Sequence, residues 1–330
     1  MGAMAHRLRN DSRLHWLDRI VVAGVIAAAI AMGLGELGRF YWLFELGSHF
    51  LVQYLFGFAI TAAYFLLRAR WRWLLVAAML AIVPAWRLAS YASSDATAAT
   101  AAAGSHRLRI MTINVHASSD RYDLVRAEIE RLDPDIVFLP ENTDRWAAGL
   151  APLRARYPYV VDGQSPSVFS LFLFSRVPIS DATIIKLPKP DGFPAIVARI
   201  CLEAGSEATC LRIVGIHPPP PVDGRIAAAR YATLQALPNL IAGAEVERTV
   251  LLGDFNCTPW SPLFRDLLAT TGMRDSARGF DLSPTWASRW LPFGLKIDHI
   301  LVGRAIAVTD HSIGDEVGSD HFPVVADLQF

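Results

Sequence analysis

The first 92 residues contain three long apolar stretches separated by short polar segments. They run from about Ile20 to Gly35, from about Phe40 to Leu67 and from Trp73 to about Tyr91. An α-helix rises about 1.5 Å per residue, so crossing ~30 Å of hydrocarbon takes roughly 20 residues. The second and third stretches reach this length, and the first is marginal. The pattern therefore predicts a membrane anchor with three transmembrane helices over residues 1–92.

Two other interpretations of this region remain open. Arginines precede a short apolar run at the N-terminus, as in a cleaved signal peptide, although a signal peptide leaves the two later stretches unexplained. The stretches could also be buried helices of a soluble domain. Their length favours membrane spans.

The distribution of arginine predicts how the anchor is oriented. The N-terminal tail carries four arginines and segment 68–72 carries three, whereas the loop between the first two stretches carries only Arg39. Loops rich in Lys and Arg stay on the cytoplasmic side of a membrane. We therefore expect a multi-pass protein of a cell membrane, with its C-terminal domain in the periplasm or outside the cell.

The remainder of the chain has the pattern of a folded α+β domain. Residues 93–106 are mostly small and lack an apolar face, which predicts a linker. From residue 107 onward, β-rich runs alternate with amphipathic stretches. Strands are expected at 107–114, 135–139, 168–174, 194–202, 209–216, 249–254, 297–302 and 322–328, and helices at 122–132, 224–240 and 261–270. The long stretch 157–217 without a helix implies antiparallel pairing in a layered domain, 107–330.

Composition and charge narrow the possible functions. Hydrophobic residues make up 53% of the chain, more than a soluble protein of this size needs. The net charge of zero divides into +4 for the first 105 residues and −4 for the rest, so the C-terminal domain is not broadly basic as a nonspecific nucleic-acid binder would be. Three cysteines exclude a disulfide framework and a paired CxxC zinc site.

Acidic, amide and imidazole residues gather where the apolar strands stop. Asp254 and Asn256 are two residues apart, so on an extended segment they face the same side. A set of such groups at strand ends is typical of a metal-assisted site. The set consists of Asn114, His116, Glu141, His217, Asp254, Asn256, Asp298, His299, Ser319, Asp320 and His321.

The motifs that contain these residues resemble those of the endonuclease/exonuclease/phosphatase superfamily, and most closely its bacterial membrane-anchored members. The matching segments, in the family's order across residues 107–330, are INVH, FLPEN, GIHP, GDFNCTPWS, PTW…IDHILV and GSDHFPV. The resemblance implies a DNase I-like fold, a four-layer α/β sandwich of two mainly antiparallel sheets with the site at their common edge. The chain departs from the family at His116, where an aspartate is frequent, and at Pro140, where a glutamine is frequent. The absence of an aspartate at His116 removes a possible second carboxylate ligand and favours a site with a single metal ion.

The resemblance also implies a role for each residue in metal-dependent hydrolysis of a phosphate ester. Asn114, Glu141 and Asp320 are the expected ligands, and oxygen ligands suit Mg²⁺ or Mn²⁺. Asp254 is expected to orient and deprotonate the attacking water, and Asn256 to donate to a phosphoryl oxygen. Asp298 is expected to hold His321 as a phosphate-facing donor, and His217 to be a second phosphate contact or the acid for the leaving group.

Other residues in these motifs are expected to be structural or remain open. His299 alternates with Asp298 and should point the other way, Ser319 should shape its loop, and His116 could contact metal or phosphate or only support its loop. Trp260 and Trp286 are expected mostly in the core, whereas Trp290 and Phe293 could equally lie near the site. Cys201 and Cys210 could form a disulfide, and Cys257 is expected to be a packed thiol.

The sequence therefore favours a membrane-tethered, metal-dependent phosphoesterase that hydrolyses a lipid-linked or small phosphodiester or phosphomonoester outside the cytoplasm. A nuclease acting on periplasmic or extracellular DNA is the alternative enzyme, which would need a basic groove beside the site. A non-catalytic binding module would be expected to lose Glu141 or Asp254, and both are present.

Overall fold

The computed structural model describes residues 15–93, 106–163, 168–188, 192–202, 210–286 and 293–330. The chain divides into two compact units, Met1–Ser90 and Tyr91–Phe330. Residues 94–105 of the predicted linker lie outside the described residues.

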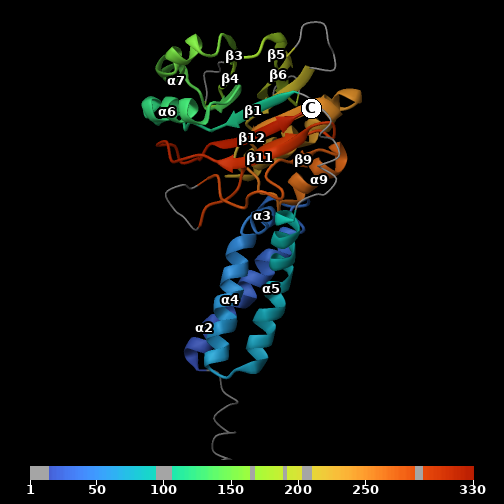
Figure 1. The fold of residues 1–330 in the computed structure, drawn as a ribbon. Coiled ribbons are helices and arrows are strands. Elements are labelled where there is room, and N and C mark those ends of the chain that lie inside the picture. The colour runs from blue at the N-terminus through green and yellow to red at the C-terminus, as the bar shows by residue number, and fades with distance from the viewer. Residues whose placement is uncertain (1–14, 94–105, 164–167, 189–191, 203–209, 287–292) are drawn as a thin grey trace, which may run out of the picture. The chain divides into compact units, whose positions relative to one another are not determined.

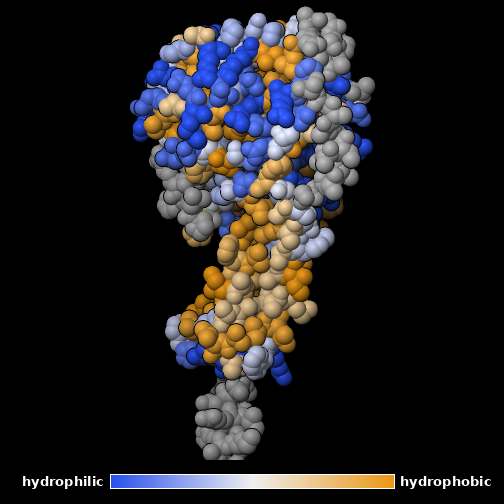
Figure 2. All heavy atoms as spheres, in the orientation of Figure 1, coloured by the Kyte–Doolittle hydropathy of each residue, from blue (hydrophilic) through white to orange (hydrophobic). Residues whose placement is uncertain are grey.

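The N-terminal unit is built from helices with largely apolar surfaces (Figure 1). Two of them, α2 (Trp16–Gly35) and α5 (Trp71–Ala92), are long and apolar enough to cross a membrane, and 17% of each apolar window is buried. A third, α4 (Leu51–Leu67), is apolar but has 17 residues. Figure 2 shows apolar residues covering the visible sides of these helices. The three predicted spans are thus represented by two helices of spanning length and one shorter helix.

The second predicted span is not one continuous helix. Residues Phe40–Leu67 form the short helix α3 (Trp42–Leu46), a turn and then α4. The turn packs tightly on α2, since a Cβ added at Gly47 would lie 2.2 Å from the Ala31 carbonyl oxygen. The break therefore lies where a glycine allows close contact between the two backbones.

A buried carboxylate joins the helix ends of this unit. Asp18 near the start of α2 is fully buried and accepts a hydrogen bond from the Tyr64 hydroxyl of α4 at 2.8 Å. The guanidinium groups of Arg68 and Arg70 each lie 3.7 Å from the same carboxylate. Because a buried charge needs compensating partners, Asp18 fixes the start of α2 against the end of α4.

The C-terminal unit contains two six-stranded mixed sheets. The first has the order β11-β12-β1-β2-β4-β3 and the second β5-β6-β7-β8-β10-β9. The pairs β1–β2 and β7–β8 are parallel and the other pairs are antiparallel. The strands are β1 (Arg107–Thr112), β2 (Ile136–Pro140), β3 (Tyr159–Gly163), β4 (Leu171–Ser175), β5 (Ile179–Leu187), β6 (Phe193–Cys201), β7 (Cys210–Ile216), β8 (Thr249–Asp254), β9 (Arg274–Asp275), β10 (Asp298–Val302), β11 (Ala307–Ile313) and β12 (Val324–Gln329).

Helices cover the outer face of each sheet, which gives four layers (Figure 1). Helices α6 (Tyr122–Leu132) and α7 (Asp144–Gly149) and the 3₁₀ turn η2 (Ala151–Ala155) pack on the first sheet. Helices α8 (Gly224–Ile241) and α9 (Pro262–Thr271), with the 3₁₀ turn η4 (Ala244–Arg248), lie over the second sheet. A third apolar cluster fills the space between the sheets. The layered α+β architecture expected from the sequence is confirmed.

Close contact between the two sheets depends on small residues in the second. The ring of Phe138 on β2 is fully buried, and a Cβ added at Gly215 on β7 would lie 2.2 Å from it. Ile110, Leu173 and Ile213 belong to the same inter-sheet cluster. This close contact fixes the carboxyl ends of β1 and β2 relative to those of β7 and β8.

Candidate active site

The predicted residues come from the ends of strands in both sheets. Asn114 follows β1 and Glu141 follows β2, while His217 follows β7 and Asp254 ends β8. Asp298 begins β10, which runs antiparallel to β8, and the register pairs it directly with Asp254. Since the ends of parallel neighbouring strands lie at the same sheet edge, these side chains can converge.

Asp254 lies at the centre of the cluster and is only 2% exposed. One carboxylate oxygen accepts the backbone N–H of Asn256 at 2.8 Å. The other accepts the Asn114 side-chain amide at 3.1 Å and lies 3.5 Å from His217 Nε2 and 3.8 Å from His321 Nε2. Burial opposes ionisation, but the His217 hydrogen bond and the His321 charge prevail and lower the pKa of Asp254. The carboxylate is therefore ionised at neutral pH.

Glu141 and Asn114 form the adjoining part of the cluster. The Asn114 amide nitrogen donates to Glu141 Oε1 at 2.9 Å, and the backbone N–H of Ala117 donates to Glu141 Oε2 at 2.8 Å. His217 Nε2 lies 3.9 Å from Glu141 Oε1. Glu141 is 17% exposed, so its carboxylate is accessible while its position is fixed.

Asp298 and His321 form a buried pair on the other side of Asp254. His321 Nδ1 lies 2.8 Å from Asp298 Oδ2, and both side chains are almost fully buried. The Thr285 hydroxyl oxygen accepts the backbone N–H groups of Ile297 and Asp298, each at 3.0 Å. Burial disfavours the imidazolium, but the Asp298 carboxylate outweighs it and raises the pKa of His321 to about 10. His321 is thus a cationic donor at neutral pH.

Two sets of ligand atoms in this cluster could hold a metal ion. Ligand atoms of Asp254, Asp298 and His321 lie within 4.8 Å of one another and are buried. In that set, however, His321 Nδ1 is engaged by Asp298 and the protonated ring has no lone pair to offer. The oxygen-bearing side chains of Glu141, Asn114 and Asp254 are the better match for a hard divalent cation.

Asp320, predicted as a metal ligand, lies at the rim with half-exposed His116. Asp320 is 41% exposed, and one oxygen accepts the Trp286 indole N–H at 3.0 Å. Its other oxygen lies 3.6 Å from His116 Nδ1. The contacts of Asp320 in the described structure therefore connect it to this rim and not to Glu141.

The structural roles expected for two neighbouring residues are confirmed. His299 points away from Asp298, with one ring nitrogen 2.9 Å from Asp275 and the other 3.0 Å from the Cys257 carbonyl. The Ser319 hydroxyl donates to the Asn114 carbonyl at 2.7 Å and accepts the His321 backbone N–H at 3.1 Å. Ser319 thereby ties two of the site loops together.

Sequence reasoning was wrong about Trp286 and missed Thr285. Trp286 was expected in the core, but it is 37% exposed because its indole N–H reaches Asp320 at the rim. Thr285 belongs to the PTW motif, but the sequence does not show that its hydroxyl accepts the backbone N–H groups of Ile297 and Asp298. Trp260 is buried as expected and Phe293 is exposed, whereas Trp290 lies outside the described residues.

The structure contains one disulfide and one free thiol among the three cysteines. Cys201 and Cys210 face each other across β6 and β7 and form a disulfide. Cys257 is a buried free thiol, as expected. The disulfide lies at the end of the second sheet remote from His217, which follows the opposite end of β7.

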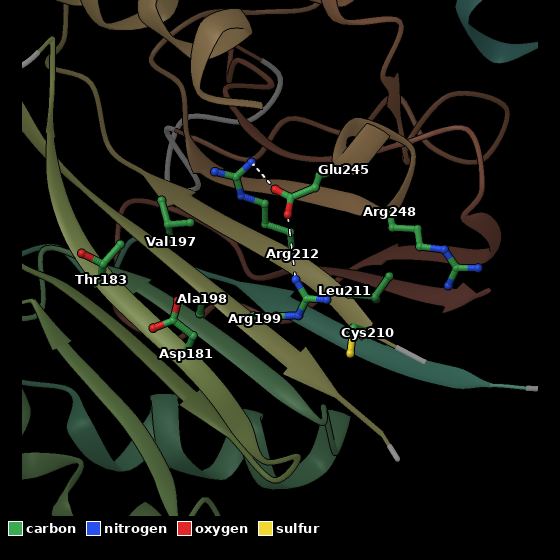
Figure 3. Close-up of a pocket in the computed structure, with 10 residues that line it drawn as sticks. All are labelled: Asp181, Thr183, Val197, Ala198, Arg199, Cys210, Leu211, Arg212, Glu245 and Arg248. Carbon is green, nitrogen blue, oxygen red and sulfur yellow. Dashed lines mark hydrogen bonds and ion pairs between the residues drawn. The ribbon is translucent and has the colours of Figure 1, made fainter. Parts of the chain in front are cut away.

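A cavity of about 530 Å³ near this disulfide is separate from the candidate site (Figure 3). Its wall includes Arg199 and Arg212, directly paired across β6 and β7, with Glu245 above them. Glu245 accepts a hydrogen bond from Arg212 at 2.9 Å and lies 3.9 Å from Arg199. Because Arg212 is five residues before His217 on an extended strand, roughly 16 Å separates the cavity from the cluster.

Comparison with known proteins agrees with this architecture. A model of the endonuclease/exonuclease/phosphatase family matches residues 111–321. Comparison with curated proteins found no match. An endonuclease/exonuclease/phosphatase from Beutenbergia cavernae DSM 12333 is 20% identical, with a TM-score of 0.57, over 68% of this chain and 72% of that chain.

Two further structures share the fold. A 3′-5′ exonuclease from Neisseria meningitidis is 22% identical, with a TM-score of 0.56, over 68% of this chain and all of its own. Sphingomyelinase C from Streptomyces griseocarneus is 17% identical, with a TM-score of 0.50, over 68% of this chain and 99% of that chain. The two mixed sheets are thus the expected DNase I-like fold. The chain belongs to the endonuclease/exonuclease/phosphatase family and is a hydrolase of phosphate ester bonds.

Proposed function

We propose that this protein is a membrane-tethered, divalent-metal-dependent phosphoesterase that hydrolyses its substrate by direct attack of water. The observation that carries the proposal is the buried, ionised Asp254 between Asn114, His217 and His321. A carboxylate held among donors in this way can accept a proton while cationic groups face the phosphate. We favour a phosphodiester or phosphomonoester that is lipid-linked or small.

The residues around Glu141 fit Mg²⁺ or Mn²⁺. Glu141 supplies a partly accessible carboxylate, and Asn114 would join it by turning its amide oxygen, which now accepts the His116 backbone N–H, toward the carboxylates. Asp320, at the rim, is proposed as a further or water-mediated ligand. A bound divalent cation would neutralise charge on the phosphoryl oxygens and help activate water.

The other residues would handle the proton and the developing charge. Asp254 orients the attacking water and takes its proton, and Asn256 donates from its side chain to a phosphoryl oxygen. His321, kept cationic by Asp298, donates to the phosphate throughout the neutral range. His217, buried beside Asp254, contacts a second phosphoryl oxygen or protonates the leaving oxygen.

The apolar helices support attachment to a lipid bilayer. Helices α2 and α5 expose most of their apolar surface, and arginines mark one end of the unit. We propose a multi-pass anchor in a bacterial inner membrane, with the catalytic domain in the periplasm or outside the cell. An enzyme tethered to the bilayer meets lipid-linked substrates readily, and a sphingomyelinase C is among the similar structures.

A panel of substrates tests the proposal. Full-length protein in detergent would be assayed with phospholipids, sphingolipids, polyprenyl phosphates and DNA, each with Mg²⁺, Mn²⁺ or EDTA. We expect hydrolysis of a lipid or small phosphate ester that EDTA abolishes and that Asp254→Asn lowers by about 10³-fold or more. Asp310→Asn, at an exposed carboxylate on β11, is the matched control and should retain full activity.

The outcomes separate the alternatives. Preferential cleavage of DNA would indicate a nuclease and not a lipid phosphoesterase. The similarity to a 3′-5′ exonuclease also supports this alternative. Equal activity of wild type and Asp254→Asn would exclude Asp254 as the group that accepts the proton of the attacking water. Binding of a phosphate ester without turnover under every metal condition would indicate the non-catalytic module.

A further inference from the structure

The turn that carries Asp254 and Asn256 has an unfavourable backbone conformation. Asn256 has φ +50°, in the left-handed region that residues other than glycine seldom adopt. Such conformations persist where their surroundings fix them. The Asn256 side chain donates to the Pro218 carbonyl at 3.0 Å and lies 3.4 Å from Asp254 Oδ2. The turn therefore determines where both side chains point.

Two buried side chains from different elements hold consecutive carbonyl groups of this turn. The guanidinium of Arg230 on α8 donates to the carbonyl oxygen of Asn256. The imidazole of His299 on β10 donates from Nε2 to the carbonyl oxygen of Cys257 at 3.0 Å. Arg230 is fully buried and His299 is 1% exposed. The turn is thus held from the helix layer and from the neighbouring strand.

The hydrogen-bond partners of His299 fix the position of its ring. Nε2 faces a backbone carbonyl, which can only accept. Nδ1 lies 2.9 Å from Asp275 Oδ2, and the other oxygen of Asp275 accepts the backbone N–H of Ala277 at 3.2 Å. The ring of His299 is therefore held between the Asp275 carboxylate and the Cys257 carbonyl.

We propose that Arg230 and His299 act as positioning residues for the catalytic turn, a role that rests on the proposed hydrolytic function. Arg230 supplies a charge-assisted hydrogen bond, which is stronger than a neutral one. His299 supplies a hydrogen bond from a buried ring that Asp275 holds in place. The two bonds fix the carbonyls on the C-terminal side of Asn256 and hold this residue in its left-handed conformation. Asp254 and the Asn256 amide are thereby oriented before substrate binds.

Four variants of the full-length protein test this role. Arg230→Met removes the donors at similar length, Arg230→Lys keeps a cation, and His299→Gln removes the ring that bridges Asp275 and the Cys257 carbonyl. Arg212→Met is the matched control, because Arg212 lies on β7 at the end of the second sheet remote from the site. We expect Arg230→Met and His299→Gln to lower kcat by about 10- to 100-fold with KM within about threefold, since a small misplacement of catalytic groups has this effect. Arg230→Lys should recover part of kcat, and Arg212→Met should retain it.

Thermal unfolding and crystal structures of the variants complete the test. An unchanged kcat in folded Arg230→Met and His299→Gln would overturn the inference, even if both melt at lower temperature. If Arg230→Met does not fold, Arg230→Lys and His299→Gln decide the question in the same way. If wild type hydrolyses none of the substrates, the proposed function fails. The positioning role of Arg230 and His299 is then tested only by the backbone conformation of Asn256. A left-handed Asn256 unchanged in the crystal structures of folded variants would then overturn it, and a displaced turn would support it.

Discussion

At the scale of single residues, the site is made from unusual backbone conformations. His116, Glu141 and Asn256 all have positive φ, at 59°, 62° and 50°. Each directly follows or closely follows a strand end, where the chain must reverse while its side chain stays at the site. The identity of these residues could be predicted from the motifs, but their conformations could not. The sequence pattern likewise gave no indication of Arg230, which lies 24 residues before Asp254.

Thr285 provides a residue-scale prediction about Asp298. Its hydroxyl oxygen accepts two backbone N–H groups, and Thr285→Val would leave both buried donors without this acceptor. We expect Thr285→Val to lower the free energy of unfolding by about 1–3 kcal/mol and to reduce kcat through displacement of Asp298. Thr285→Ser keeps the hydroxyl and should be close to wild type. Chemical denaturation and steady-state kinetics measure both effects, and a Val variant as stable and active as the Ser variant would contradict the prediction.

His311 predicts how stability depends on pH. Burial, together with the nearby charge of Lys296, lowers the pKa of His311 to about 3, although Asp275 and Asp281 act in the opposite direction. The unfolded chain binds a proton at this residue below about pH 6.5, whereas the folded protein does so only near pH 3. Stability is therefore lost as the pH falls from about 6.5 toward 3.

Replacement by glutamine isolates this contribution. His311→Gln can still hydrogen-bond Ser276, which lies 3.0 Å from His311 Nδ1, but it cannot titrate. We expect the variant to lose less unfolding free energy than wild type between pH 6.5 and 4.5, by about 2 kcal/mol at most. Urea denaturation at both pH values measures this difference. Identical losses in the two proteins would show that His311 does not contribute.

At the scale of secondary structure, the predicted elements and the missed ones differ in their position in the sheets. Strand 249–254 and helix 122–132 have the bounds expected from the sequence. The strands without a predicted range are β3, β5, β9 and β11, which occupy the four sheet edges. An edge strand such as β5 is largely exposed and lacks the apolar run that identifies a central strand. In the N-terminal unit, the break between α3 and α4 lies at Gly47, Ser48 and His49, which interrupt the stretch predicted as one span.

Gly215 gives a prediction for the packing of the two sheets. An alanine Cβ at this position would lie 2.2 Å from the buried Phe138 ring, so the sheets must shift or the ring must move. We expect Gly215→Ala to lower the free energy of unfolding by about 1–3 kcal/mol. Adding Phe138→Leu should recover part of this loss by removing the overlap. Denaturation of the single and double variants tests the coupling, and purely additive losses would be evidence against the contact.

At the scale of the whole molecule, the family and the set of polar strand ends could be predicted, but not how these residues contact one another. The pairing of Asp298 with Asp254 follows from the antiparallel register of β10 on β8, which depends on tertiary structure. The rim position of Asp320 likewise depends on its bond with Trp286. Motif order therefore identifies the chemistry of the site, whereas packing decides which carboxylate lies at its centre.

The membrane topology is the final prediction at this scale. Arginines lie in the N-terminal tail and in segment 68–72, whereas the loop after α2 carries only Arg39. With three crossings by α2, α4 and α5, this distribution places the tail and segment 68–72 in the cytoplasm and the catalytic domain on the opposite side. Alkaline phosphatase fused after Phe330 should be active in cells and a fluorescent protein fused there should be dark, with the reverse pattern for fusions after Arg70. A fluorescent C-terminal fusion would place the site in the cytoplasm. In that case two membrane crossings, by α2 and α5, would fit better than three, because α4 is shorter than the other two helices.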